Sequence, residues 1–361
     1  MKKKKGICYS GIGGQAVLEG VMMKNKDNYA VAVRKPNNEI EVEVDTYHSF
    51  IHGSKVKEWP FIRGVFNFVD SLVLGMKCLN YSASFYEKEE EKETKADKAL
   101  SKVFKGKTEK VVTVITTIIS FALAIGIFFV LPMLLSSLFH KFVRNEALEA
   151  VIEGIIRIAI FLAYVILISL MKDIRRVYQY HGAEHKCINC IEAGKELTVL
   201  NVMRSSRLHR RCGTSFLLFV VAISIILFFF IRTDTMLLKI VYRVALIPVI
   251  ASISYEILRI AGKYDNAFTR IISLPGMLLQ KLTTREPDRK MIEVAIAAVE
   301  AVFDWKTYIA QMNQPEDAAE PENTEEAEVE NTSEESDESE DEATEETEIS
   351  EEESVDVEEE K

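Results

Sequence analysis

The sequence predicts a mainly α-helical, polytopic protein with four transmembrane helices, a small β-containing N-terminal part and a disordered acidic C-terminal tail. Three observations predict this fold class: four long apolar stretches, an excess of basic residues in one connection between them, and an acidic run at the end. A buried core helix can be as apolar as any one of these stretches. Four of them in a chain of 361 residues favour a membrane protein.

The charge of the chain is divided between a basic body and an acidic end. The formal net charge is −11, but residues 316–361 hold 25 Asp or Glu and one Lys, which leaves +13 for residues 1–315. A basic body suits a membrane protein with cationic cytoplasmic flanks. No DNA-binding or RNA-binding signature is present, so no specific nucleic acid is expected as a partner. The tail either repels nonspecific partners or attracts a basic one.

Residues 1–57 are expected to form a small β-containing cytoplasmic region. Tyr29–Val33 and Glu39–Val44 have the character of strands and flank a turn signal at Pro36–Asn38. Before them, Gly11–Met23 is expected to be a glycine-bearing loop, which lacks the lysine of a P-loop and the spacing of a dinucleotide site. The lysine-rich start is followed by no sustained apolar core, so no secretory signal peptide is expected.

An amphipathic or membrane-associated helix is predicted for residues 58–86. Its apolar residues are interrupted by Arg63, Asn67, Asp70 and Lys77. The stretch is therefore too polar for a clear transmembrane span, and we expect the helix to lie on the membrane or to pack against the bundle. A mixed-charge linker is expected at 87–110.

The four transmembrane helices are expected within residues 111–260. They are Val111–Phe139, Ile155–Met171, Thr214–Ile231 and Leu237–Leu258. The first is long enough to cross a hydrocarbon core of about 30 Å. Arg157, in the second, is expected to extend its side chain to the membrane interface.

The basic residues set the expected orientation. The connection from Lys172 to Arg211 carries nine Lys or Arg, which places it in the cytoplasm, and both termini are then cytoplasmic. Beyond the spans, residues 261–311 are expected to form a cytoplasmic helical region with an amphipathic helix after Pro287. Residues 312–361 are the disordered tail.

The stretch most suited to chemistry runs from His181 to Cys190, within the predicted cytoplasmic loop 172–213. If the segment is helical, His181 and His185 share one face and can reach one metal ion, with Glu184 next to that face. The topology brings three more candidates to the same membrane face: His209, Cys212 and Glu256. The five cysteines, an odd number, indicate a reducing compartment rather than a disulfide framework.

In the first ligand scheme, His181 and His185 hold a divalent metal ion, expected to be zinc, and Glu184 is the general base. The third ligand is Glu256, His209 or Cys212, and one coordination position is left for water. Such a site can lower the pKa of its water to about 7 for attack on a carbonyl or phosphoryl group. The function predicted from this scheme is a metal-dependent hydrolase at the cytoplasmic membrane face.

Two other schemes stay open. In the second, a closed structural zinc site belongs to a noncatalytic membrane scaffold or transporter component, and its ligands are Cys187, Cys190, His209 and Cys212. In the third, the histidines and thiols pack among the helices without a metal. The H-x-x-E-H pattern also resembles that of the inverzincin metalloproteases, but over five residues only, so protease chemistry does not follow.

Five motifs resemble the bacterial YqhQ family, which is described as predicted metal-dependent membrane enzymes of unknown function. They are Gly13–Met23, Tyr29–Pro36, His181–Lys186, Leu208–Ser215 and Thr283–Pro287. The resemblance runs from about Gly11 to Phe303 and leaves the acidic tail outside. It implies a multi-pass protein of the bacterial cell membrane with no substrate to carry over. It also implies four candidate pocket residues: Gln15, Glu19, Arg285 and Glu286.

Overall fold

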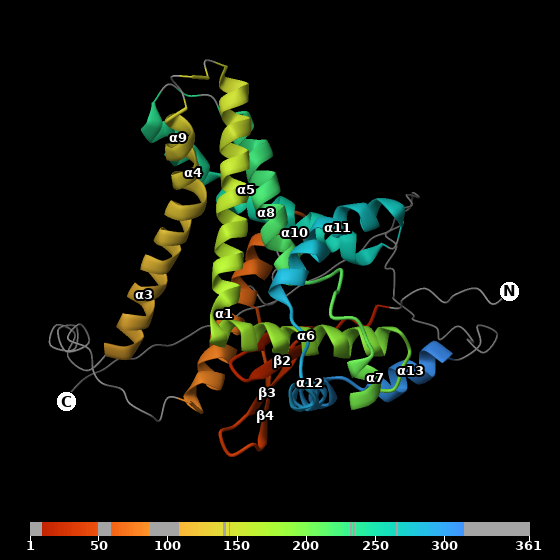
Figure 1. Cartoon of the computed structure of the whole chain (residues 1–361). Helices are drawn as coiled ribbons and strands as arrows, with labels where there is room; N and C mark the ends of the chain where they lie inside the picture. The colour runs from red at the N-terminus through yellow and green to blue at the C-terminus, as the bar shows by residue number, and fades with distance from the viewer. Residues whose placement is uncertain are drawn as a thin grey trace, which may run out of the picture. The chain divides into compact units, whose positions relative to one another are not determined.

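The structure is a computed structural model of the chain (Figure 1). It describes residues 9–49, 59–86, 108–139, 142–143, 145–231, 233, 235–264 and 266–313. Residues 314–361 of the predicted acidic tail and most of the predicted charged linker lie outside the described residues, whereas the first two residues of that tail, Met312 and Asn313, are helical. Within them the chain is mainly helical, with one small antiparallel sheet near the N-terminus.

Two helices are long and apolar enough to cross a membrane. One is a continuous rod made of α3 (Thr108–Ile125), the π-helical segment η2 (Gly126–Val130) and α4 (Leu131–Ser137), and the other is α5 (Glu146–Leu170). Helices α9 (Met236–Ala245) and α10 (Ile247–Lys263) meet this test only as a pair, bent by 41° at their junction. The chain therefore has two or three candidate spans, and α8 (Gly213–Phe229) is a shorter apolar helix.

These apolar helices expose hydrophobic side chains and bury polar ones. Ile155, Leu167 and Leu237 are 62%, 65% and 71% exposed. Arg157, which was expected to extend to the membrane interface, is instead only 2% exposed. The prediction is wrong because the Arg157 guanidinium pairs with Glu153, one helical turn away, and turns inward. An apolar surface around a polar interior is the pattern expected of helices in lipid.

The N-terminal sheet has four antiparallel strands in the order β1-β2-β3-β4. They are β1 (Gly13–Val17), β2 (Gly20–Asn25), β3 (Asn28–Arg34) and β4 (Ile40–Thr46). The predicted hairpin is confirmed as β3 and β4, whereas the expected glycine-bearing loop is a second hairpin, β1 and β2. Strand β2 gives no alternating pattern because it is buried on both faces: Val21 and Met23 pack on one side and Met22 on the other.

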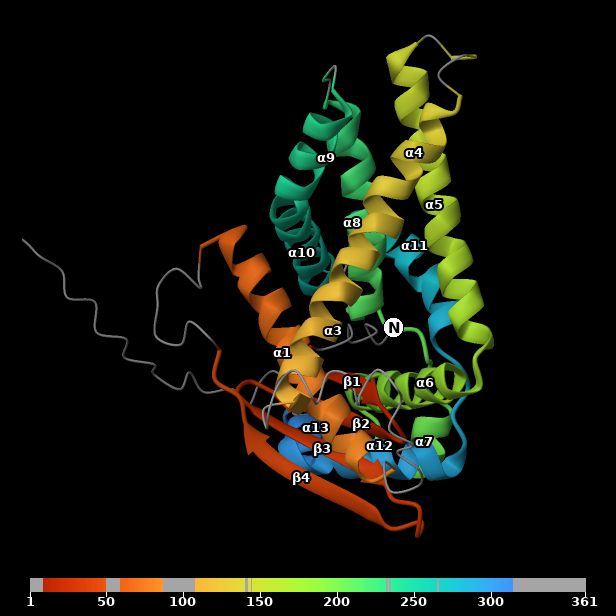
Figure 2. The same cartoon turned by 90° about the vertical axis from the view of Figure 1, so that its left-hand side faces the viewer.

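Helices cover both faces of the sheet (Figure 2). Helix α1 (Ile62–Ser84) packs Leu74 and Cys78 against Val17 and Met22. The other face contacts α12 (Arg289–Val302), which begins just after Pro287 as predicted. Helix α1 also contacts α10, so it joins the sheet to the apolar helices.

The predicted loop 172–213 is largely helical. It contains α6 (Lys172–Glu192) and the short α7 (Val199–Met203). Figure 1 shows α6 running crosswise below α5 and α8. The chain then continues through α8 and α10 to α11 (Ala267–Thr283), which packs against α8, and ends its described part with α13 (Trp305–Asn313). Helix α6 thus lies between the sheet and the ends of the apolar helices.

Candidate metal centre

Helix α6 carries two functionally different faces. Its apolar face, with Tyr180, Ala183 and Ile188, belongs to the core shared with α12 and the sheet. The other face carries His181 and His185, whose ring centroids are 4.4 Å apart. The four-residue spacing therefore does place both imidazoles side by side on one helix.

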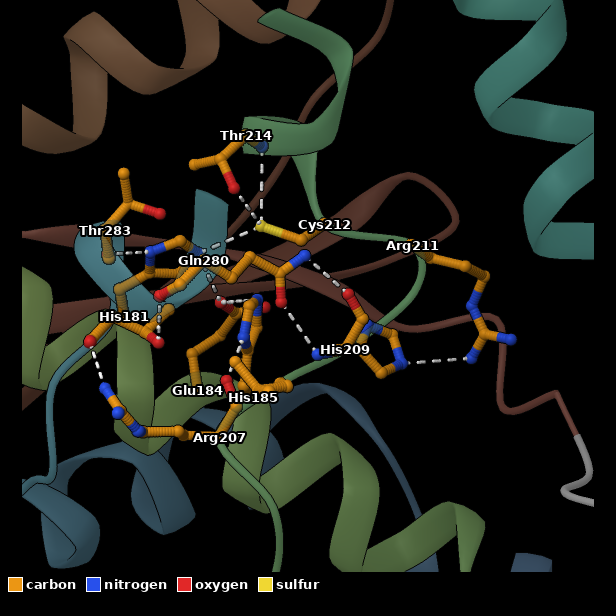
Figure 3. A network of polar contacts seen from close by, with 12 residues as sticks. His181, Glu184, His185, Arg207, His209, Arg211, Cys212, Thr214, Gln280 and Thr283 are labelled. Carbon is orange, nitrogen blue, oxygen red and sulfur yellow. Dashed lines mark hydrogen bonds and ion pairs between the residues drawn. The ribbon is translucent and has the colours of Figure 1, made fainter. Parts of the chain in front are cut away.

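Backbone carbonyl groups fix the orientation of both imidazole rings (Figure 3). The Nδ1 of His181 lies 2.9 Å from the carbonyl oxygen of Thr283, and the Nδ1 of His185 lies 2.7 Å from that of Arg207. Because a carbonyl oxygen can only accept, each neutral ring carries its proton on Nδ1. Both Nε2 atoms are then left without a proton, which is the arrangement of metal-binding histidines.

Cys212 completes a group of three potential ligands. Its Sγ lies 3.2 Å from the Nε2 of His181, and one potential ligand atom from each of the three residues lies within 4.8 Å of the others. Cys212 also caps α8, accepting a hydrogen bond from the backbone N–H of Thr214 at 3.4 Å. Imidazole and thiolate are both ligand types that zinc takes in proteins.

Glu184 lies beside this group. Its Oε2 is 3.8 Å from the Nε2 of His181 and 3.7 Å from that of His185. Burial raises the pKa of Glu184 to about 7, although the neighbouring His181 lowers it in part. The carboxyl group can therefore both accept and release a proton near neutral pH.

Strand β1 closes the site over Glu184. A Cβ added to Gly14 would lie only 2.7 Å from the Cγ of Glu184, so the bare glycine backbone is what permits this approach. The first glycine-bearing motif and the histidine motif, far apart in sequence, thus meet at the carboxylate.

His209 lies next to the group without joining it. Its ring centroid is 5.7 Å from that of His185, and its Nε2 is 3.4 Å from a carboxylate oxygen of Glu192. Burial lowers the pKa of His209, so the ring is neutral. Gln280 of α11 holds its backbone, accepting from the His209 N–H at 2.9 Å and donating to the His209 carbonyl at 2.7 Å.

The remaining predicted ligands lie elsewhere. Glu256 on α10 forms a two-pronged ion pair with Arg63 of α1, at 2.6 and 2.5 Å, and this pair joins the two helices. Cys187 and Cys190 lie in the apolar core of α6, where the Cys190 thiol faces the carbonyl oxygen of Glu196 at 3.4 Å. Among the described residues, the four ligands of the second scheme therefore do not come together. Helix α6 points His181 and His185 toward Cys212, whereas it points the Cys187 and Cys190 thiols into the core.

The segment 283–286 supports the centre from outside. The carbonyl of Thr283 orients His181, and the Glu286 carboxylate pairs with Lys186 at 3.0 Å and Arg207 at 3.3 Å. The Arg285 N–H donates to the Tyr178 carbonyl at 2.8 Å, which fixes the segment along α6. The sequence did not predict the roles of Thr283, Arg207 and Gln280 in this site. Thr283 and Arg207 act through backbone carbonyl groups, which every residue has.

The other two candidate pocket residues lie away from the three ligands. The Gln15 amide packs against Gly75 of α1, at a distance that leaves no room for a Cβ there. Glu19 pairs with Arg176 and accepts from the Tyr180 hydroxyl at 3.2 Å. It lines a polar cavity of about 290 Å³ on the sheet side of α6.

The comparisons with known proteins agree on one family. Residues 59–305 match the family described as protein of unknown function (DUF1385). The chain is 34% identical over 315 residues to the uncharacterized protein YqhQ of Bacillus subtilis (strain 168), an alignment that covers 84% of this chain and 95% of the relative. No solved structure matches. The chain is therefore a member of the YqhQ family.

Proposed function

We propose that this protein is a zinc-dependent membrane enzyme, a hydrolase that works at the cytoplasmic face of the bacterial cell membrane. His181, His185 and Cys212 are the ligands, and Glu184 is the general base. The observation that carries the proposal is the convergence of one potential ligand atom from each of His181, His185 and Cys212, with both rings fixed through Nδ1.

The proposed chemistry follows from the ligand number. Three protein ligands leave a fourth position open, and a bound zinc ion would supply Lewis acidity and an activated water there at about neutral pH. Glu184 stands less than 4 Å from both imidazole Nε2 atoms, where it can accept a proton from that water. It can then return the proton to a leaving group.

The proposed membrane placement uses four spans with both termini in the cytoplasm. The spans are α3 to α4, α5, α8, and α9 with α10. With 17 residues, α8 measures about 26 Å, close to the thickness of the hydrocarbon core. The basic residues between Lys172 and Arg211 support a cytoplasmic position for the metal centre. A basic partner for the acidic tail remains part of this proposal.

A second candidate function rests on one distance. The Cys212 thiol lies 3.2 Å from the Nε2 of His181, which is the geometry of a nucleophile and its base, and the Thr283 carbonyl orients the ring from the other side. The protein would then be a metal-free thiol enzyme that forms an acyl intermediate on Cys212. The third candidate is a noncatalytic scaffold with a structural zinc ion, and it would use the same three ligands.

Metal analysis of the purified full-length protein separates the two zinc-binding functions from the metal-free thiol enzyme. We expect about one zinc ion per chain in the wild type, and loss of it in His181→Ala, His185→Ala and Cys212→Ser. Cys190→Ser is the matched control, because this buried thiol lies on the same helix but faces the core. Metal-free wild type with a Cys212 that reacts with iodoacetamide would refute the zinc site and favour the thiol enzyme.

Glu184→Gln then separates an enzyme from a scaffold. We expect this variant to keep its zinc, because Glu184 is outside the ligand group, and to lose the protein's function in a complementation assay of the deleted gene. A variant that keeps both zinc and function would refute the role of Glu184 as general base.

A further inference from the structure

Three ionisable side chains are buried among the apolar helices, apart from the metal centre. Glu153 and Arg157 lie on α5 and Arg243 lies on α9, and their side chains are 9%, 2% and 7% exposed. Arg157 stands 13 residues before the end of α5 at Leu170, which corresponds to about 20 Å along the helix. Charged groups at such a depth in a membrane protein are rare and mark functional sites.

The carboxylate of Glu153 links the two guanidinium groups. One oxygen accepts from Arg157 at 2.5 Å, and the other accepts from Arg243 at 2.8 Å. Arg157 is further satisfied by the Phe128 carbonyl at 3.2 Å and the Ser224 hydroxyl at 3.4 Å. The triad therefore connects α5, η2, α8 and α9.

Arg243 is left with unmet hydrogen-bonding capacity. Its Nε and Nη1 are fully buried and have no hydrogen-bond partner in the described part of the chain. The three side chains also carry two positive charges and one negative charge. Both guanidinium groups also lie over the Phe228 ring, which offsets part of their charge. The triad still lacks two hydrogen-bond acceptors and keeps a net charge of +1, and an oxyanion would satisfy both.

Two irregular helical segments meet at the same triad. The π-helical segment η2 supplies the Phe128 carbonyl that receives Arg157, and α9 ends at Ala245, two residues after Arg243, where the helix axis bends by 41°. π-Helical turns and interrupted membrane helices recur at ligand sites. Because the free N–H groups of Arg243 are buried, ligand entry requires α9 to move, and its junction with α10 at Leu246 is the hinge available.

We propose that Glu153, Arg157 and Arg243 form an oxyanion site within the transmembrane helices and that its ligand is a phosphate group bound by Arg243. The phosphate belongs to inorganic phosphate or to the headgroup of an anionic lipid. A lipid would lie next to the site and reach it when α9 moves, because the apolar side chains of α9 on the side away from Arg243 are exposed, among them Leu237 and Val241.

The test is thermal unfolding of the full-length protein under two sets of conditions. Sodium phosphate is compared with sodium chloride at equal ionic strength in a neutral detergent, and phosphatidylglycerol nanodiscs are compared with phosphatidylcholine nanodiscs. We expect phosphate or phosphatidylglycerol to raise the unfolding temperature of the wild type by several degrees. A rise with phosphate identifies the free anion as a ligand, and a rise with phosphatidylglycerol alone identifies the lipid.

Two variants show whether the triad is responsible. Arg243→Gln should lose the rise, whereas Lys239→Gln, with the same charge change on the same helix, should keep it. Glu153→Gln raises the net charge of the triad to +2, so it should unfold at a lower temperature without the anion and show a larger rise with it. If Arg243→Gln does not fold, Glu153→Gln decides alone. No rise in the wild type, or an unchanged or smaller rise in Glu153→Gln, would overturn the proposal.

Discussion

The contact between strand β1 and Glu184 is tested by Gly14→Ala. The added Cβ would lie 2.7 Å from Glu184 Cγ, 2.8 Å from the Met22 carbonyl oxygen and 2.9 Å from Met23 Sδ. Carbon atoms at rest stand about 3.5–4.0 Å apart, so the neighbours would have to withdraw by roughly 1 Å. The Met22 oxygen is part of the sheet backbone and has little freedom to do so.

Overpacking of this kind costs about 1–3 kcal/mol of folding free energy. For a protein of this size, that corresponds to a fall of roughly 1–5 °C in the unfolding temperature. Gly13→Ala is the matched control, since a Cβ at this neighbouring position meets nothing within 4 Å. We expect it to leave the unfolding temperature unchanged or slightly higher, because alanine lowers the entropy of the unfolded chain.

The assay is thermal unfolding of both variants in the same detergent. Equal unfolding temperatures for Gly14→Ala and Gly13→Ala would refute the close approach of β1 to α6. The double variant Gly14→Ala/Glu184→Ala removes the Cγ of Glu184, so part of the loss should be recovered relative to the sum of the single changes. Strict additivity would show that the strain falls on Met22 and Met23 rather than on Glu184.

Three further changes address the surroundings of the centre. Gly182→Ala places a Cβ 2.1 Å from the Arg285 carbonyl oxygen and should lower the unfolding temperature further than Gly14→Ala does. The raised pKa of Glu184, about 7, makes metal-free wild type more stable as the pH falls from 7 toward 4.5, and Glu184→Gln should abolish this gain in urea unfolding at about pH 5 and pH 8. Glu256→Gln should weaken the link between α1 and α10 and lower stability, yet leave the zinc content unchanged, as measured by plasma mass spectrometry.

The local part of the candidate metal centre could be predicted from the sequence, because helix periodicity alone brings His181 and His185 together. The choice among Glu256, His209 and Cys212 could not be. It depends on partners far away in the chain: Arg63 holds Glu256, and Glu192 lies beside His209. Only the position of Cys212 at the start of α8 turns its thiol toward His181.

The fold divides in the same way. The apolar stretches of the sequence predicted the positions of the long helices, because a helix in lipid needs an uninterrupted run of hydrophobic residues. The first hairpin escaped prediction because Val21, Met22 and Met23 are apolar on both faces, so β2 has neither a helical nor an alternating pattern. The second face of β2 is covered by α1, which lies some 50 residues later in the chain. No local pattern of β2 could therefore predict that this face is buried.

The position of the proposed centre has consequences for how a metal ion would act on the fold. His181 and His185 belong to α6, Cys212 begins α8, and the carbonyl that holds His181 comes from the last residue of α11. Occupation of the three ligands would therefore fix α6 against the ends of two other helices, and metal removal should loosen this junction even if the site is catalytic. A stabilising effect of zinc is thus no evidence against an enzyme. Glu184 contributes no ligand atom to the group, so a change at Glu184 distinguishes a catalytic zinc ion from a structural one.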